Sequence, residues 1–390
     1  MTRPTAYFDN AATTPVRAEV LDAMLPYLGG ELFGNPSSAH GPGRAARSGL
    51  ERARREIAEA LGVEPSEVIF TSGGTEADNL AVIGAALRAR TAGRPMLVSV
   101  PPTEHKAVLA AAHAVAHLGG TERFLPVDGT GLLDLAGLDL ALAEQPAVVS
   151  VMWVNNETGV IQPIEEIARR CAARSVPFHT DLVQAFGKVP VSLTSVSLAT
   201  LSGHKLGAPK GIGALIVRRG VALEPLIHGG GQQRGVRPGT ENIAGAVALG
   251  RAVALAAAEQ AAEAARLGAL RDELAARLRT LIPDLVVAGD GAPRAPHILN
   301  MMIPGTRSEA LLMHLDMAGI AASGGSACST GTPEPSHVLS AMGFPAELAF
   351  GAVRLSLGRG STAEDITLAI EAFPGAVTKV RKLTETLNRG

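Results

Sequence analysis

The sequence predicts an α/β protein: a mostly parallel sheet flanked by helices, joined to a smaller α+β domain. Two observations predict this fold class. Over residues 66–220, short apolar runs of strand composition alternate with runs of helical periodicity, a pattern typical of parallel sheets whose crossovers are helices. After an alanine-rich stretch, residues 243–265, this alternation is lost. The change of pattern indicates a second, smaller unit.

The first half of the alternating region contains two strand and helix pairs. SEVIFTSGG (66–74) is expected to be a strand that runs into glycines, and residues 75–87 follow it with helical spacing. PMLVSV (95–100) is the next strand, and EHKAVLAAAHAVAHLG (104–119) is the next helix. The apolar residues of both helices recur at the spacing of a buried helical face.

The second half continues the alternation and then adds further strands. AVVSVMWV (147–154) is apolar throughout, as expected of a strand buried on both faces. PIEEIARRCAAR (163–174) has helical spacing. The runs VPFHTD (176–181), SLATLSGHK (197–205) and IGALIVRRG (212–220) are predicted strands.

The C-terminal third begins with residues 243–265, which carry charged residues within an alanine-rich run and predict a long helix of a soluble protein, not a membrane span. HILNMMI (297–303) and AVRLSLG (352–358) are the clearest strands after it. The last helix begins near Ser361, which has capping-box spacing to Glu364. We expect three segments: an N-terminal segment packing near the small domain (1–14), a large domain (15–257) and a small domain (258–390).

Composition narrows the function classes. The chain has 390 residues, a formal net charge of −2 and 3% aromatic residues, so neither a polyanion-binding nor a base-stacking surface is expected. Two cysteines cannot form a disulfide framework, and no CxxC spacing is present, which favours a reducing, cytoplasmic location. The start, MTRPTAYFDNAATTP, has no apolar run behind a basic end, so no secretory signal is expected. We expect no direct nucleic-acid or membrane partner and no metal.

Polar residues gather where the predicted strands end. In open α/β sheets, ligands bind beyond the carboxyl ends of the strands. These positions are therefore the candidates for a binding site: Ser72 to Thr75, His105, Asn155 to Glu157, His179 to Gln184, and Ser202 to Lys205.

The segment TSGGTEADN (71–79) places two glycines and a hydroxyl at the start of a predicted helix. Free backbone N–H groups and the helix dipole at such a position suit a phosphate. No Lys-Ser/Thr pair follows the glycines, so this is not the Walker pattern. A plain tight turn is the alternative.

Lys205 follows an apolar strand and precedes a Gly/Pro turn. An amine held at a strand end, partly removed from water, is able to form an imine with an aldehyde. The alternative is a solvated turn lysine, the usual situation for this residue type. Lys210 is the rival amine, although it lies deeper in the loop and away from the strand.

Asp181 ends a predicted buried strand, and a buried carboxylate needs a partner because an unpaired buried charge is very costly. A protonated ring nitrogen would satisfy it, and a helix cap or an internal salt bridge is the alternative. His179, Asp181 and His204 also imitate a two-histidine, one-carboxylate iron site. The alternating α/β pattern is unlike the all-β oxygenases that use such sites, so we do not expect iron.

The two cysteines have different surroundings. Cys171 continues the apolar face of helix 163–174, so a buried, inert thiol is expected. Cys328 lies in ASGGSACSTGTPEPS (322–336), a stretch of small residues, glycines and prolines without periodicity, which predicts a loop. An exposed thiol is an oxidation liability, so Cys328 is a candidate nucleophile.

The motifs together resemble those of cysteine desulfurases, class V members of the fold-type I pyridoxal-phosphate enzymes. The resemblance covers almost the whole chain in unbroken order, and the length between Cys328 and Arg354 is similar to that of the long-loop (group I) branch. The motifs that carry it are YFDNAATTP (7–15), GNPSSAHGPGR (34–44), SGGTEADN (72–79), TEHKAV (103–108), NNETG (155–159), HTDLVQAFGK (179–188), SGHKLGAPKGIGAL (202–215), GGGQQRGVRPGTEN (229–242), GSACSTGTPEPSHVL (325–339) and VRLSLGR (353–359).

The resemblance implies pyridoxal 5'-phosphate as cofactor and a set of residues that bind it. Lys205 would hold it covalently, Asp181 would pair with its ring nitrogen, and Gln184 would bond its ring hydroxyl oxygen, with Asn155 beside it. The phosphate would be held by four residues of the same subunit and one of the neighbouring subunit, which requires a homodimer. These residues are Gly74, Thr75, Ser202, His204 and, from the neighbour, Thr240.

The resemblance also implies the substrate, L-cysteine, and the residues that act on it. His105 would stack on the cofactor ring and move protons. Arg354 would bind the substrate carboxylate as a bidentate pair, with Asn35 a weaker candidate and Asn155 nearby. The Cys328 thiolate would attack the substrate sulfur, release L-alanine and keep a persulfide.

The persulfide would pass to a sulfur acceptor, in iron–sulfur cluster assembly or thiolation. Three alternatives remain open: a selenocysteine lyase, another class V enzyme such as a transaminase, and, more distantly, a hydrolase that uses Cys328 as its nucleophile. A pure binding or scaffold protein would be colourless and would need neither Lys205 nor a cofactor.

Overall fold

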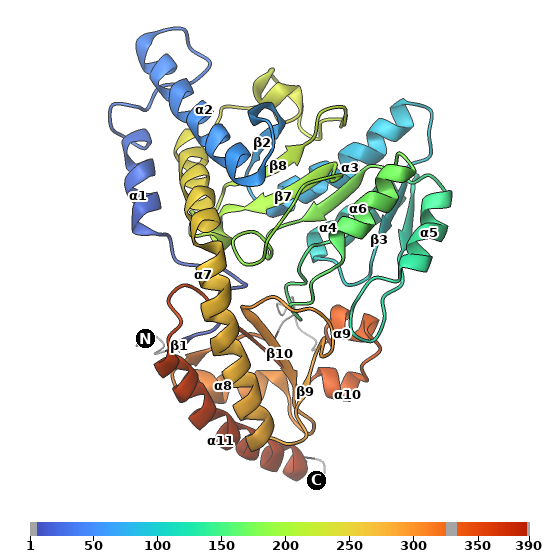
Figure 1. Ribbon diagram of the computed structural model, residues 1–390, viewed down its shortest axis with the longest axis vertical. Helices are drawn as coiled ribbons and strands as arrows, with labels where there is room; N and C mark the ends of the chain where they lie inside the picture. The colour runs from blue at the N-terminus through green and yellow to red at the C-terminus, as the bar shows by residue number, and fades with distance from the viewer. Residues whose placement is uncertain (1–5, 325–333, 388–390) are drawn as a thin grey trace.

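The computed structural model describes residues 6–324 and 334–387, with side chains as far as residue 384 in the last helix. In this part of the chain the largest sheet has seven strands, drawn in Figure 1. Their order across the sheet is β2 (Val68–Thr71), β8 (Gly213–Val217), β7 (Leu198–Ser202), β6 (Phe178–Asp181), β5 (Val148–Ser150), β3 (Leu97–Val100) and β4 (Thr121–Phe124). Among these described strands, six run in one direction and β8, between β2 and β7, runs in the opposite direction. The mostly parallel sheet expected from the sequence is confirmed.

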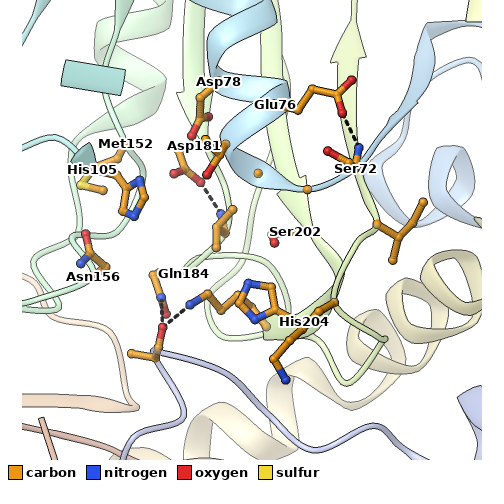
Figure 2. A pocket seen from close by; sticks show the side chains of 18 of the residues that line it. Ser72, Glu76, Asp78, His105, Met152, Asn156, Asp181, Gln184, Ser202 and His204 are labelled. Carbon is orange, nitrogen blue, oxygen red and sulfur yellow. Dashed lines mark hydrogen bonds between the residues drawn. The ribbon is translucent and has the colours of Figure 1, made fainter. Parts of the chain in front are cut away.

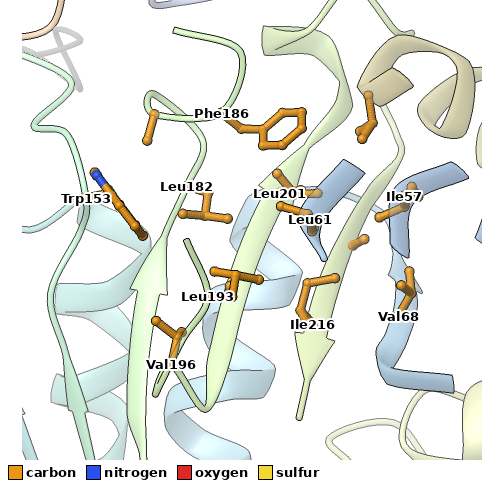
Figure 3. Packing of buried hydrophobic residues seen from close by; sticks show 14 of the residues in the cluster. Ile57, Leu61, Val68, Trp153, Leu182, Phe186, Leu193, Val196, Leu201 and Ile216 are labelled. Atoms are coloured by element: carbon orange, nitrogen blue, oxygen red, sulfur yellow. The ribbon is translucent and has the colours of Figure 1, made fainter. Parts of the chain in front are cut away.

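All strands of this sheet except the edge strand β4 are buried on both faces, which explains the apolar sequences of β2, β3, β5 and β8. Successive residues point to opposite faces, so Leu198 and Leu215 join one core cluster while Ala199 and Ile216 join another. Figure 3 shows the second cluster, with Leu182, Phe186 and Leu201 beside Ile216. Helices α3 (Gly74–Thr91) and α4 (Lys106–His117) cover the first face, and α2 (Gly41–Leu61), α6 (Ile164–Ala173) and α7 (Ile243–Leu281) cover the second.

The smaller part of the structure has its own core around an antiparallel sheet. Its three strands are β12 (Ala352–Ser356), β10 (Ile298–Met302) and β9 (Val286–Val287), in that order. The C-terminal part of α7 packs against this sheet together with α8 (Ser308–Met317) and α11 (Ala363–Leu387). A few buried residues of α9 (His337–Ala341) and α10 (Ala346–Ala349) form a separate cluster with β10 and β12.

Helix α7 joins the two parts and runs without interruption through residues 257 and 258 (Figure 1). Its first third is buried in the large core, and four residues near its C-terminus are buried in the small one. None of residues 254–266 is buried. By length and composition alone α7 could cross a membrane, but 56% of the relevant window is buried inside the protein.

The N-terminal segment connects the two parts. Strand β1 (Ala6–Tyr7) pairs in parallel with β11 (Ile320–Ala321). A few residues later, Thr14 N donates to His204 O at 3.0 Å in the large part. Residues 9–12 therefore form a turn between the two units, in which Ala12 N donates to Asp9 O at 3.0 Å, and Ala11 O lies beside Gln184 and Lys205.

Three local details differ from expectation or extend it. Strand β5 ends at Ser150, although Val151 N and Trp153 N still donate to the β6 carbonyls of His179 and Asp181. The cap of α11 is one residue later than predicted: Thr362 and Asp365 exchange the capping hydrogen bonds, while Ser361 Oγ accepts from Gly358 N. The remaining elements are α1 (Ala18–Met24), α5 (Leu135–Ala143) and the short helices η1 (Leu25–Tyr27), η2 (Pro65–Glu67), η3 (Gly203–Lys205) and η4 (Gln232–Gly235).

Candidate active site

A cavity of about 490 Å³ lies beyond the carboxyl ends of the parallel strands. Each of β2, β3, β5, β6 and β7 contributes residues that follow its last position, as the rule for open α/β sheets predicts. Figure 2 shows His105, Asp181, Gln184 and His204 around this one space. Eight of the residues expected at the site line it: Gly74, Thr75, His105, Asp181, Gln184, Ser202, His204 and Lys205.

Lys205 ends the short helix η3, directly after β7. Its Nζ donates to the carbonyl oxygens of Ala11 and Ala12, the latter at 2.6 Å. Burial and the positive charge of Arg354 lower the pKa of Lys205 to about 8, against the opposing effect of Asp181. A lysine with this pKa is partly neutral near physiological pH, and the neutral amine is the form that attacks an aldehyde.

Asp181 is the last residue of β6 and is buried. Its Oδ1 accepts a hydrogen bond from Val183 N at 2.7 Å. Burial raises the pKa of Asp181 to about 6, although the Val183 N–H and Lys205 act in the opposite direction. None of the ion pairs found among the described residues includes Asp181. The site therefore offers a buried carboxylate that a cationic N–H group would stabilise.

Two further buried acids lie behind Asp181. Asp78 comes from α3 and Glu104 from the end of β3, and each keeps one buried oxygen without a hydrogen-bond partner in the described part of the chain. Burial, followed in each case by other contributions that include the charge of Asp181, raises the pKa of both carboxyl groups well above the usual range. Burial therefore favours the neutral form of both acids, whereas the pKa of Asp181 is raised only to about 6.

The N-terminus of α3 opens into the cavity between Ser72 and Thr75. The first N–H groups of a helix have no intrahelical acceptor and favour an anion. The Oγ of buried Ser202 lies beside Gly74: a Cβ atom added at this glycine would lie 3.7 Å from that oxygen and 3.3 Å from Ser202 Cβ. His204 also lines the cavity, and its Nδ1 lies 3.1 Å from the hydroxyl oxygen of Thr13. This arrangement suits a phosphate group.

His105 is the N-cap of α4, where its Nδ1 accepts a hydrogen bond from Ala107 N at 3.1 Å. His105 is exposed to the cavity, but neighbouring protein atoms limit its contact with water. This desolvation, followed by the positive charge of Lys205, lowers the pKa of His105 to about 4. The ring is therefore neutral and carries its proton on Nε2, because Nδ1 is the acceptor. A neutral imidazole at the cavity wall can stack on a planar ligand and donate a hydrogen bond or a proton from Nε2.

Arg354 lies on β12 and does not line the cavity. Its guanidinium bonds Asn156 O and the carboxylate of Asp9, each at 2.8 Å. Its Nε is buried without a hydrogen-bond partner in the described part of the chain. Arg354 thus lies at the junction of the two parts, and these two bonds use two of its five N–H groups.

Four expected residues lie elsewhere or outside the described part. Asn155 is buried, and its side chain is used in protein contacts: Oδ1 accepts from Glu157 N and Thr158 N, and Nδ2 donates to Thr103 O at 2.8 Å. Its neighbour Asn156 lines the cavity instead. Asn35 is exposed and accepts a bond from Ser37 N. Thr240 is exposed and is not part of the cavity wall. Cys328 lies outside the described residues.

The position of His179 does not support an iron site formed by His179, Asp181 and His204. Both of its ring nitrogens are engaged in the core, with Ser150 Oγ at 2.8 Å and Thr200 Oγ1 at 3.0 Å. No cluster of three or more potential metal ligands occurs within residues 6–324 and 334–384. Cys171 is fully buried as expected, and burial raises its pKa to about 12, so it is an inert thiol.

Sequence reasoning missed several residues at the site. Ala11 contributes only its backbone carbonyl, which no sequence pattern reveals. Asp78 could have been found from the sequence, because it is an acidic residue on the apolar face of α3. Ala81, Val82 and Ala85 follow it at helical spacing, and all three are buried. Asp9 had no such signal, since its contact with Arg354 joins segments far apart in the chain.

The cavity fits pyridoxal 5'-phosphate. A buried carboxylate without a cationic partner, an amine with a lowered pKa and a helix N-terminus beside a serine hydroxyl match the three polar parts of that molecule: ring nitrogen, aldehyde and phosphate. When bound, the cofactor would be held by Asp181, Lys205 and the start of α3. It would supply an electron sink for the amino acid joined to it.

Comparisons with known proteins agree with this geometry. Residues 6–368 match the aminotransferase class-V family. The chain is similar to cysteine desulfurase IscS of Dictyoglomus turgidum, at 42% identity over 97% of this chain and 96% of the relative, and to cysteine desulfurase NifS of Azotobacter vinelandii, at 45% over 97% and 94%. A solved structure of a "NifS-like protein" superposes with a TM-score of 0.88 at 36% identity, covering 96% of this chain and 99% of the other.

Proposed function

The chain belongs to the aminotransferase class-V family and is a pyridoxal-phosphate-dependent cysteine desulfurase; from this premise we propose which of its residues perform each part of the reaction. The substrate is L-cysteine and the products are L-alanine and enzyme-bound sulfur. The observation that carries the assignment of residues is the convergence of Lys205, Asp181, His105 and Gln184 on one cavity at the strand ends.

Lys205 would bind the cofactor through its amine, and we assign it the role of the base that moves the substrate proton. Its lowered pKa lets it accept and return a proton near neutral pH. Asp181 would keep the ring nitrogen protonated, since the buried carboxylate would gain a cationic partner. His105 would stack on the ring and donate a proton from Nε2, and Arg354 would bind the substrate carboxylate through N–H groups that its bonds to Asp9 and Asn156 leave unused.

Cys328 supplies the nucleophile, an assignment that rests on its sequence context. Its thiolate attacks the substrate sulfur: a sulfur–sulfur bond forms, the substrate carbon–sulfur bond breaks, and the electron pair stays on carbon, which later takes a proton to become alanine. The persulfide on Cys328 then passes to an acceptor protein of iron–sulfur cluster assembly or thiolation. A selenocysteine lyase uses the same cavity without needing this thiol.

Thr240 supports a homodimer. It is exposed and is not part of the cavity wall of its own subunit, so its proposed contact with a phosphate fits the neighbouring subunit better. We place the enzyme in the cytoplasm without membrane attachment, because the apolar window of α7 is mostly buried within the protein. The modest net charge of −2 gives no surface for a direct nucleic-acid partner.

Cysteine replacement tests the proposal, and the chain supplies its own control. We expect Cys328→Ala to lose production of alanine and persulfide from L-cysteine, while Cys171→Ala retains it because that thiol is buried and protonated. Turnover of selenocysteine should survive in both variants. Wild-type turnover of L-cysteine by Cys328→Ala would contradict the proposed nucleophile, a keto-acid product would indicate a transaminase, and a colourless protein would indicate a hydrolase.

A further inference from the structure

His297 is a buried histidine at the junction of the two parts of the structure. It directly precedes β10 and is 1% exposed. Its Nε2 lies 3.3 Å from Oε1 of Gln184, which lines the cofactor cavity. Its Nδ1 is buried and has no hydrogen-bond partner in the described part of the chain. Within the described residues, the one polar contact of the ring is therefore the contact with Gln184 in the cavity wall.

The ring of His297 is neutral. Burial lowers its pKa well below the usual range, and the positive charges of Lys188, Arg271 and Arg354 act in the same direction. A neutral imidazole has one N–H group. Because the amide oxygen of Gln184 can only accept, the proton lies on Nε2, and Nε2–H donates to Gln184 Oε1.

The other end of the Gln184 amide is constrained independently. Its Nε2 donates to Ala11 O at 3.0 Å, and a carbonyl oxygen cannot donate in return. The two contacts agree on a single orientation: oxygen toward His297, nitrogen toward Ala11. The amide nitrogen has two N–H groups, of which Ala11 uses one. The second is the donor that Gln184 can offer to the cavity, which it lines together with His204 and Asp181 (Figure 2).

We propose that His297 is a positioning residue, which fixes the Gln184 amide so that an N–H group faces the ring hydroxyl oxygen of the cofactor. The inference rests on the proposed role of Gln184 as the partner of that oxygen. It assigns to His297 no contact with substrate or cofactor. If the amide were free to rotate, its oxygen could face the ring oxygen, and two acceptors would oppose each other.

Three variants test this, and the readouts are the dissociation constant of the cofactor and the pH midpoint of its visible absorption band. His297→Leu removes the donor. His297→Gln restores it, because the glutamine Nε2 reaches the position of the imidazole Nε2. Gln184→Leu removes the recipient. We expect His297→Leu to weaken cofactor binding about fivefold to tenfold, the effect of one neutral hydrogen bond, and to shift the midpoint, and we expect His297→Gln to stay within about twofold of wild type.

The double variant His297→Leu/Gln184→Leu separates a positioning role from a general packing role. If His297 acts through Gln184, the double variant binds the cofactor as weakly as Gln184→Leu alone. Additive losses, or a His297→Leu protein with wild-type affinity and midpoint while Gln184→Leu is impaired, overturn this inference alone. An unimpaired Gln184→Leu overturns the proposed role of Gln184 itself. Melting curves of the cofactor-free variants establish folding, and His297→Asn replaces His297→Leu if the latter does not fold.

Discussion

The carboxylate of Asp9 and the guanidinium of Arg354 form an ion pair at 2.8 Å across the junction of the two parts of the structure. The arginine side chain is 5% exposed, and the aspartate side chain is 25% exposed. The arginine also donates to Asn156 O, so it ties the N-terminal segment, the loop after β5 and strand β12 together. The residue proposed to bind the substrate carboxylate is thus already oriented by a carboxylate of the protein.

Replacement of this aspartate should destabilise the protein. Asp9→Asn leaves a buried guanidinium without its counterion, and we expect the free energy of unfolding to fall by about 2 to 4 kcal/mol. The matched control is Glu144→Gln, which breaks the exposed pair with Arg123 and should cost less than about 1 kcal/mol. Urea unfolding of the cofactor-free proteins measures both. Equal losses in the two variants would mean that the Asp9 pair is no more than a surface ion pair.

Replacement of the arginine should affect substrate recognition specifically. We expect Arg354→Gln to raise KM for L-cysteine about 10- to 100-fold, the effect of losing hydrogen bonds to a charged carboxylate. Cysteamine, which lacks the carboxylate, serves as the control ligand. Its affinity should be unchanged, so the preference for L-cysteine over cysteamine should fall in the variant. A parallel loss for both ligands would assign Arg354 a structural role only.

Capture of the cofactor by Lys205 should depend on pH. Its pKa in the folded protein is lowered to about 8, chiefly by burial, and only the neutral amine attacks an aldehyde. The rate at which cofactor-free protein develops its visible band should therefore rise with pH, with a midpoint near 8. Stopped-flow absorbance at a series of pH values measures this rate.

The control for this experiment is Lys210, which lines the same cavity but is exposed. Lys205→Ala should show no visible band, whereas Lys210→Ala should develop one at the wild-type pH midpoint. Borohydride reduction followed by peptide mass analysis should place the cofactor on residue 205. A label on residue 210 would show that the rival amine is the reactive one.

Asp181→Asn should make the cofactor-free protein more stable at high pH. The folded pKa of about 6 exceeds the ordinary value of 3.8, so the folded protein binds this proton more tightly than the unfolded chain does. The stability it contributes is present below pH 3.8 and is lost as the pH rises through 6. Asparagine undergoes no such loss, so the variant should melt a few degrees higher than wild type at pH 8.

The difference in melting temperature should vanish below about pH 3, where aspartic acid is protonated in both the folded and the unfolded state. Cofactor should stabilise the variant less than it stabilises wild type, because a neutral amide does not hold the ring proton. Asp316→Asn, at an exposed position of α8, should change neither quantity. A variant that melts below wild type at pH 8 would indicate that Asp181 stabilises the empty site.

The sequence predicted the sheet and the strand-end residues because both follow local rules. Apolar runs predicted β6 and β7, and the residues at and after their ends, Asp181 and Lys205, are those that line the cavity. The same rules cannot decide between adjacent positions in an irregular loop: they indicate Asn155 to Glu157 together, and of these only Asn156 lines the cavity. No periodicity distinguishes the three.

Contacts between distant segments were beyond local reasoning. Ala11 reaches the site because β1 pairs with β11 and the chain then returns to the large part. His297 contacts Gln184, 113 positions away in the chain, from the position directly before strand β10 of the other part. These residues are recognised only when the packing of the two parts is known, since their own sequence neighbourhoods resemble ordinary loop and strand ends.

The loop that carries Thr240 is held in one shape, which bears on its proposed role in a second subunit. Gln233 and Arg234 have φ angles of 47° and 62°, a left-handed conformation that side chains rarely adopt. Buried Gln233 is held by Phe70 N at 3.0 Å and by Arg54. A loop fixed in this way can present a hydroxyl to a phosphate with little loss of entropy on assembly.

Thr240→Ala should therefore weaken cofactor binding by about 10- to 100-fold, the effect of losing a hydrogen bond to a charged phosphate, and mixing subunits should restore it. A hybrid dimer of Thr240→Ala with Lys205→Ala contains one complete site, because the second subunit lends its threonine to the first. The control hybrid pairs Thr240→Ala with Thr240→Ala/Lys205→Ala and contains none. Sedimentation should show dimers, and half-restored activity in the first hybrid alone requires that the threonine acts across the subunit boundary. Equal activity in the two hybrids, or a monomer in solution, would place Thr240 outside any shared site.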